Sequence, residues 1–213
     1  MTNIYRSPAC EETTEARPLP VGKAGWRTPG WWGVLALIGT EAAVFAYLIF
    51  SYFYLQSQTS EPWPPSGLPP LRWSAPGTAL LLVSAATTWW ADRGMRLGRP
   101  ARLYSGFVAT LLLGIGYVAL QCFDWRNEPF LANSGAYASM FYAITAFHVL
   151  HAAVGVLIVA AIIGWCAMGY ITPRRNSAVT VVALYWYFVV AAWIAVFITL
   201  YLLPWITPHG APP

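Results

Sequence analysis

The sequence of 213 residues has little charge for its length. Lys, Arg, Asp and Glu make up 9% of it, whereas hydrophobic residues make up 58%. Soluble domains carry about 25% charged and 45–50% apolar residues, so a soluble globular enzyme is disfavoured, and the apolar content excludes a disordered chain. The formal net charge is +4, but the basic residues are too few and too scattered to form the stripe of a nucleic-acid binder.

Cysteine is also scarce. The three cysteines are Cys10, Cys122 and Cys166, and their spacing fits neither a disulfide framework nor a zinc site. The sequence also lacks a nucleophile–base pair, a phosphate loop and a dinucleotide fingerprint in a plausible context. It therefore offers no self-sufficient catalytic site.

What the sequence does have is long stretches without charge. A membrane-spanning helix needs about 20 mostly apolar residues, and the uncharged stretches predict an all-α integral membrane protein with five such helices. A tail of residues 1–30 precedes the transmembrane domain of residues 31–205, and residues 206–213 form a second tail. We place the helices near 31–55, 75–91, 103–123, 134–168 and 178–203.

The positions of Lys and Arg predict the orientation of the five helices. With five spans, ten of the twelve basic residues lie on one side, in the N-terminal tail and in the loops after the second and fourth helices. Only Arg72 and Arg126 lie on the other. Because basic residues favour the cytoplasmic side, we expect the N-terminus inside and the C-terminus outside.

Glu41 is the one acid at mid-membrane depth, about ten residues, or roughly 15 Å, into the first predicted helix. A buried carboxyl there is either a proton-handling or lipid-contacting group, or a protonated hydrogen-bonding group that fixes helix packing. The packing interpretation is favoured, because the sequence lacks the further acids of a proton path.

His148 and His151 lie three residues apart on the fourth predicted helix, and therefore near one face. Two rings on one helix cannot bind opposite faces of one haem. A metal site with Glu41 is conceivable, but helix-borne di-metal sites use about four carboxylates. We expect both histidines to hydrogen-bond between helices and to Glu41, and we expect no metal in this chain.

Five segments, in order, give the chain a resemblance to subunit III of the haem–copper cytochrome c and quinol oxidases, in the short form with five helices. Much of the resemblance rests on a few residues. They are the glutamate of the first segment, the two histidines of the fourth, and the aromatics Tyr185, Trp186 and Trp193 of the fifth. The segments are Gly39–Ala46, the loop Trp63, Pro64, Pro65, Ser66 and Gly67, Pro76–Thr88, Thr145–His151 with Gly155, and Tyr185–Val190 with Trp193.

The resemblance implies a non-catalytic subunit of a respiratory complex that reduces oxygen and pumps protons. It implies haem and copper in partner subunits and none in this chain. It further implies packing against subunit I, bound phospholipid, support of proton uptake, and residence in the inner membrane of a prokaryotic cell. Tyr185, Trp186 and Trp193 would serve packing of the last helix or lipid contact.

The sequence departs from the family where Tyr187 and Val190 stand in place of the usual His and Asp, which thins the polar network of the last helix.

Alternative functions are the accessory subunit of nitric-oxide reductase that shares this fold, a free-standing transporter and a metal-dependent membrane enzyme. The transporter is disfavoured because the sequence has no internal repeat and few intramembrane charges.

Overall fold

The computed structural model describes residues 29–65, 67–169 and 177–206, and within them every regular element is a helix. The last three elements follow one another without a break and form a single rod, so the prediction of five helices is confirmed. The elements are α1 (Pro29–Ser57), α2 (Leu71–Arg96), α3 (Pro100–Asn127), α4 (Ala136–Ala167), α5 (Ser177–Phe197), the π-helical turn η1 (Ile198–Leu202) and α6 (Leu203–Ile206).

Four helices of the described part are long and apolar enough to cross a membrane, namely α1, α3, α4 and the rod Ser177–Ile206. The remaining helix, α2, is rich in hydroxyl side chains, which lower its hydropathy. Several of these bond back to their own helix, as Thr88 Oγ1 does to the Ser84 carbonyl at 2.8 Å. That α2 also crosses the membrane stays a prediction.

Helices α2 and α3 are longer than predicted. α2 begins at Leu71 even though Pro76 lies in its second turn, where a missing N–H costs a single hydrogen bond near the helix end. It runs on to Arg96 because basic side chains suit the C-terminal end of a helix. α3 continues to Asn127. Most of the two predicted tails lies outside the described residues.

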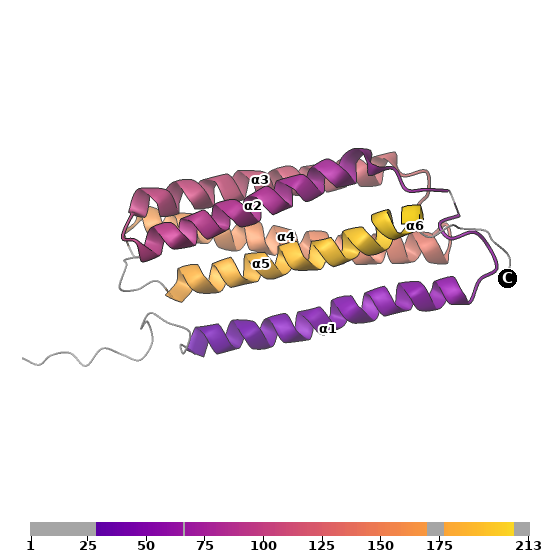
Figure 1. Cartoon of the computed structure of the whole chain (residues 1–213), viewed down its shortest axis with the longest axis horizontal. Helices are drawn as coiled ribbons and strands as arrows, with labels where there is room; N and C mark the ends of the chain where they lie inside the picture. Colours follow the sequence, from indigo (N-terminus) through magenta and orange to yellow (C-terminus); the bar gives the residue numbers. More distant parts are fainter. Residues whose placement is uncertain (1–28, 66, 170–176, 207–213) are drawn as a thin grey trace, which may run out of the picture.

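The five rods run side by side, with α4 and α5 in the middle (Figure 1). α1 packs on α4 and α5 along one flank, and the hairpin of α2 and α3 covers the opposite flank. Glycine allows this close packing. A Cβ at Gly106 would lie 2.7 Å from that of Ala91, and one at Gly114 would lie 2.7 Å from the Trp186 ring.

The last helix is fixed to α2 and α3 by three buried aromatic side chains. The indole N–H of Trp186 donates to Ser84 Oγ, and that of Trp193 donates to Thr78 Oγ1, both at 2.9 Å. Further along, Tyr201 in η1 donates to Asp124 Oδ2 at 2.6 Å. These donors point to the same flank of the rod and set its register against the α2–α3 hairpin.

Candidate functional site

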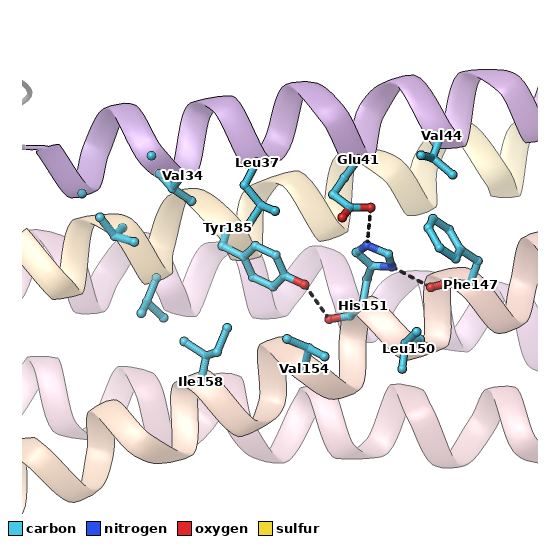
Figure 2. A pocket seen from close by; sticks show the side chains of 14 residues that line it. Val34, Leu37, Glu41, Val44, Phe147, Leu150, His151, Val154, Ile158 and Tyr185 are labelled. Atoms are coloured by element: carbon cyan, nitrogen blue, oxygen red, sulfur yellow. Dashed lines mark hydrogen bonds and ion pairs between the residues drawn. The ribbon is translucent and has the colours of Figure 1, made fainter.

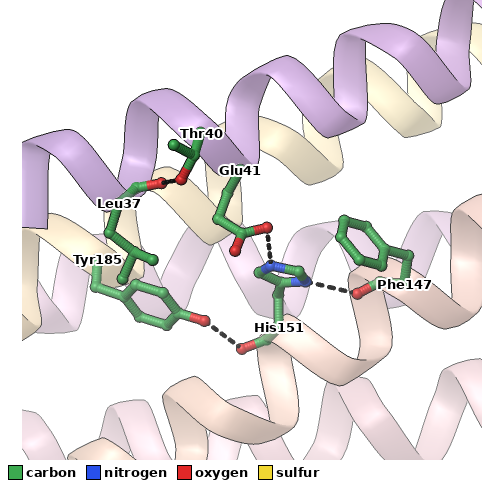
Figure 3. Close-up of polar contacts among 6 residues, drawn as sticks. All are labelled: Leu37, Thr40, Glu41, Phe147, His151 and Tyr185. Atoms are coloured by element: carbon green, nitrogen blue, oxygen red, sulfur yellow. Dashed lines mark hydrogen bonds and ion pairs between the residues drawn. The ribbon is translucent and has the colours of Figure 1, made fainter.

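Glu41 and His151 meet at the junction of α1 and α4. His151 Nε2 lies 3.1 Å from Glu41 Oε2, and His151 Nδ1 lies 2.7 Å from the Phe147 carbonyl oxygen of its own helix. Figure 3 shows the imidazole held between these two partners, with the Tyr185 hydroxyl donating to the His151 carbonyl at 3.2 Å. The pair thus joins three helices at one point.

The geometry of His151 fixes the number of protons in this pair. A carbonyl oxygen can only accept, so Nδ1 carries a hydrogen and donates it to Phe147. The bond between Nε2 and Glu41 then needs one further proton. It is either on the carboxyl of Glu41, with both groups neutral, or on Nε2, with an imidazolium facing a carboxylate. In both forms the pair holds one proton in that bond and has no net charge.

The pair lines a cavity of about 720 Å³ between α1, α4 and α5 (Figure 2). Glu41 and the phenol of Tyr185 bring polar atoms to an otherwise apolar wall. The side chain of Glu41 is 27% exposed and that of His151 10% exposed, so the carboxyl is open to the cavity. The apolar lining comes from Val34, Leu37, Val44, Phe147, Leu150, Val154, Ile158, Val181 and Val182.

His148 does not contact Glu41. It is fully buried about 60° around α4 from His151, where its ring nitrogens lie 2.9 Å from the Tyr117 hydroxyl and 3.0 Å from the Val189 carbonyl. Because that carbonyl accepts from Nε2, the neutral ring accepts from Tyr117 through Nδ1. Of the two histidines, one therefore joins α4 to α1, and the other joins α4 to α3 and α5.

The remaining predicted residues lie away from this cavity. Trp186 and Trp193 are fully buried against α2, as described above, whereas Tyr185 lines the cavity. The loop containing Trp63, Pro64, Pro65 and Gly67 lies at the far end of the bundle. There Trp63 packs edge-on against the rings of Tyr52 and Tyr137. Gly67 has φ +85°, a left-handed conformation that favours glycine.

Among the described residues, no group of three or more His, Cys, Asp or Glu side chains is arranged to hold a metal ion. In particular, Glu41, His148 and His151 do not converge, since His148 is turned toward Tyr117 and Val189 rather than toward Glu41. The cavity instead presents one proton-bearing hydrogen-bonded pair on an apolar surface. Such a site suits packing or the binding of an apolar ligand.

A second polar cluster was not predicted from the sequence. Asp124 lies just beyond the predicted end of the third helix, but α3 continues three residues past it and its side chain is buried. It accepts from Tyr201 at 2.6 Å and from Gln121 at 3.2 Å. The i, i+3 spacing of Gln121 and Asp124 was the available sequence signal, since it places both on one helix face.

Glu128 follows this cluster in the loop after α3. Burial and the nearby charge of Asp124 raise the pKa of Glu128 from its ordinary 4.5 to about 7. Its Oε1 is buried and has no hydrogen-bond partner among the residues that the structure describes. It lines a small pocket of about 40 Å³ together with Pro64, Gly67 and Tyr137, so it supports the loop between α1 and α2.

Comparison with known proteins supplies what the geometry alone leaves open. The family model described as cytochrome c oxidase subunit III matches residues 20–205. The chain is 30% identical over 210 residues to cytochrome c oxidase subunit 3 of Cyprinus carpio, which covers 94% of this chain and 78% of that protein. It is 31% identical over 179 residues to the protein of the same name from Latimeria chalumnae, covering 80% and 68%.

Proposed function

The chain belongs to the cytochrome c oxidase subunit III family, and we propose that it acts in a haem–copper terminal oxidase by stabilising the catalytic subunit I, binding phospholipid and supporting proton uptake. The observation that carries this proposal is the family match over residues 20–205, which includes all five helices and the Glu41–His151 pair. The family is non-catalytic, and oxygen reduction is the work of the complex as a whole.

The proposed topology has the N-terminus inside and five spans, with α2 as the fifth. It is supported by the positions of the arginines at the two ends of the bundle. Arg93, Arg96, Arg99 and Arg102 cluster at the α2–α3 turn, whereas Arg72 begins α2 and Arg126 ends α3 at the opposite end. Basic residues favour the inner side. We propose the inner membrane of a prokaryotic cell as the site of this multi-pass protein.

The proposed phospholipid site is the cavity between α1, α4 and α5. Its volume of about 720 Å³ is within the range of about 300–1,000 Å³ that small-molecule ligands use, and its long apolar wall suits an acyl chain. Bound lipid would fill the space that the loosely packed α1 leaves, and would thereby stabilise the attachment of α1 to the bundle. Support of proton uptake would follow from fixing these helices beside subunit I.

Co-purification tests the assembly. The chain is tagged at its C-terminus and extracted with its complex in a mild detergent. We expect a haem spectrum and a larger subunit in stoichiometric amount, together with oxygen reduction. A haem complex that reduces nitric oxide instead would favour the nitric-oxide reductase alternative. The tagged chain eluting alone would overturn the proposal, and stoichiometric zinc, iron or copper in it would point to a metal-dependent enzyme.

The supporting role needs a separate comparison of the complex with and without this chain. We expect the depleted complex to take up protons more slowly and to lose activity sooner during turnover, and we expect re-addition of the chain to restore both. Equal proton uptake and equal lifetime in the two preparations would overturn the supporting role while leaving family membership untouched.

A further inference from the structure

The turn between α2 and α3 holds four arginines within ten residues, which the proposed topology uses only to assign a side of the membrane. We call Arg93, Arg96, Arg99 and Arg102 the arginine hairpin. The turn is tight, because Arg99 N–H donates to the Gly94 carbonyl at 2.9 Å and a Cβ at Gly94 would lie 2.5 Å from that of Arg102. The four side chains therefore leave the backbone close together.

The positive charge of the arginine hairpin is only partly neutralised by the protein. Arg96 forms an ion pair with Asp92 at 2.8 Å. Within the described residues, Arg93, Arg99 and Arg102 form no ion pair. Among the residues that the structure describes, one carboxylate thus faces four guanidinium groups, which leaves three positive charges on a single turn.

Two of these arginines lie over tryptophan rings. Arg93 Cζ is 5.4 Å from the ring centre of Trp89, and Arg102 Cζ is 5.7 Å from that of Trp90. The two rings are 54% and 39% exposed. A guanidinium stacked on a ring keeps the N–H groups at its edge free to donate. Exposed tryptophans beside arginines are typical of the depth at which lipid headgroups lie.

The helix dipoles do not account for this arrangement. Arg93 and Arg96 lie in the last turn of α2, where positive charge is favourable, but Arg99 and Arg102 lie at the start of α3, where it is unfavourable. Within the described ranges, the opposite end of the bundle has only Arg72 and Arg126, at separate helix ends. An external anion would neutralise the excess charge of the arginine hairpin.

We propose that the arginine hairpin binds the phosphate of an anionic phospholipid headgroup, with Trp89 and Trp90 against the adjoining lipid. Guanidinium groups donate paired hydrogen bonds to phosphate oxygens, and each basic residue near an anionic membrane surface adds about 1 kcal/mol. That the site faces the inner leaflet rests on the topology under "Proposed function"; the binding itself does not depend on it.

The test is lipid binding by the full chain in neutral detergent, with bound lipid counted by native mass spectrometry. The probes are dioleoyl phosphatidylglycerol, which is anionic, and dioleoyl phosphatidylcholine, which is zwitterionic. The variant is the triple substitution Arg93→Gln, Arg99→Gln and Arg102→Gln. Its matched control is the double substitution Arg72→Gln and Arg126→Gln, which also removes an arginine over a tryptophan, since Arg72 lies 5.0 Å from the Trp73 ring.

We expect the native chain and the control to prefer the anionic lipid by about tenfold or more at low salt, and the triple variant to lose this preference. Raised salt should weaken the preference in the native chain. Equal affinity for the two lipids, or full retention in the triple variant, would overturn the proposal. So would displacement of the lipid by inorganic phosphate at equal concentration, which would indicate a site for free anions.

Should the triple variant fail to fold, as judged by its helix content, the single substitution Arg99→Gln keeps the test decisive. Arg99 is exposed, and its guanidinium forms no ion pair with the described residues. The change should lower the affinity for phosphatidylglycerol about fivefold. Unchanged affinity would overturn the proposal. The assay uses neither oxidase activity nor assembly, so its failure is distinguishable from failure of the proposed function.

Discussion

Helices α1 and α5 are attached to the same bundle in different ways. α5 buries ten of its 21 residues, including Trp186 and Trp193, whereas α1 buries three of its 29. α5 is fixed by indole hydrogen bonds and glycine contacts, while α1 is attached through the rings of Phe45 and Tyr52 and the Glu41–His151 hydrogen bond, beside a cavity. The comparison indicates a rigid core and a flank whose attachment depends on what fills the cavity.

The sharpest test of the rigid side is Trp186→Ala. This side chain is fully buried, lies against Gly114 and Gly155, and donates to Ser84. Its loss leaves a large void, and large-to-small changes of this kind cost about 3–5 kcal/mol. Thermal unfolding of the full chain in detergent, followed by circular dichroism, should show a large fall in midpoint.

The matched control for this change is Trp165→Ala on the outer face of α4, where the ring is 48% exposed. We expect its effect on the midpoint to be small. Similar losses in the two variants would break the comparison, because the buried position would then matter no more than an exposed one.

The titration of Glu128 tests the stability of the end of the bundle where the loops of both regions meet. Its pKa of about 7 in the folded chain exceeds its ordinary 4.5, so the folded state binds more protons between these values. Stability is therefore expected to fall as pH rises through that window. After allowance for partial exposure, the loss is about 1–2 kcal/mol.

Glu128→Gln should remove this pH dependence, since glutamine does not ionise. Unfolding midpoints near about pH 5 and about pH 8 measure it, and Glu61→Gln in the exposed loop is the matched control. If Glu128→Gln retained the native slope, the titrating group would lie elsewhere.

On the side of α1, two substitutions at Glu41 separate the two proton arrangements. Glutamine can donate to His151 Nε2, so Glu41→Gln should keep the hydrogen bond and the stability if the carboxyl is protonated. Glu41→Leu leaves that nitrogen unpaired and should cost about 1 kcal/mol, near the upper range for bonds between membrane helices. Hydrogen exchange of α1 measures its attachment.

An equal loss of stability in Glu41→Gln and Glu41→Leu would contradict the arrangement in which Glu41 and His151 are both neutral. A carboxylate facing an imidazolium would then be required, because glutamine can satisfy the hydrogen bond but not the charge. Loss of protection in α5, rather than in α1, would instead break the comparison between the two regions.

The sequence predicted the helices better than their contacts. Hydrocarbon excludes charge, so charge-free stretches mark helices directly, and five were found in the predicted order. Charge does not mark where a helix stops. For that reason the predicted bounds missed the start of α2 at Leu71 and the end of α3 at Asn127, and Asp124, just outside the predicted helix, lies buried within α3.

Contacts between helices were harder to predict because they depend on small angles. Residues three apart on a helix differ by about 60° in direction. At the junction of α4 with three neighbours, this difference turns His151 toward Glu41 and His148 toward Tyr117 and Val189. Likewise, the π-helical turn that brings Tyr201 to Asp124 depends on a partner 77 residues away, which no local pattern shows.

The smallest expected effect belongs to Tyr185→Phe, which removes the hydroxyl that donates to the His151 carbonyl at 3.2 Å and keeps the ring in the cavity wall. Bonds of this kind average about 0.6 kcal/mol in membrane proteins, so overall unfolding should hardly change. Since the bond joins α5 to the residue that holds α1, exchange protection near Glu41 should fall while protection around Trp186 stays. A fall in both would mean that the flank and the core open together, and that the two attachments are one cooperative unit.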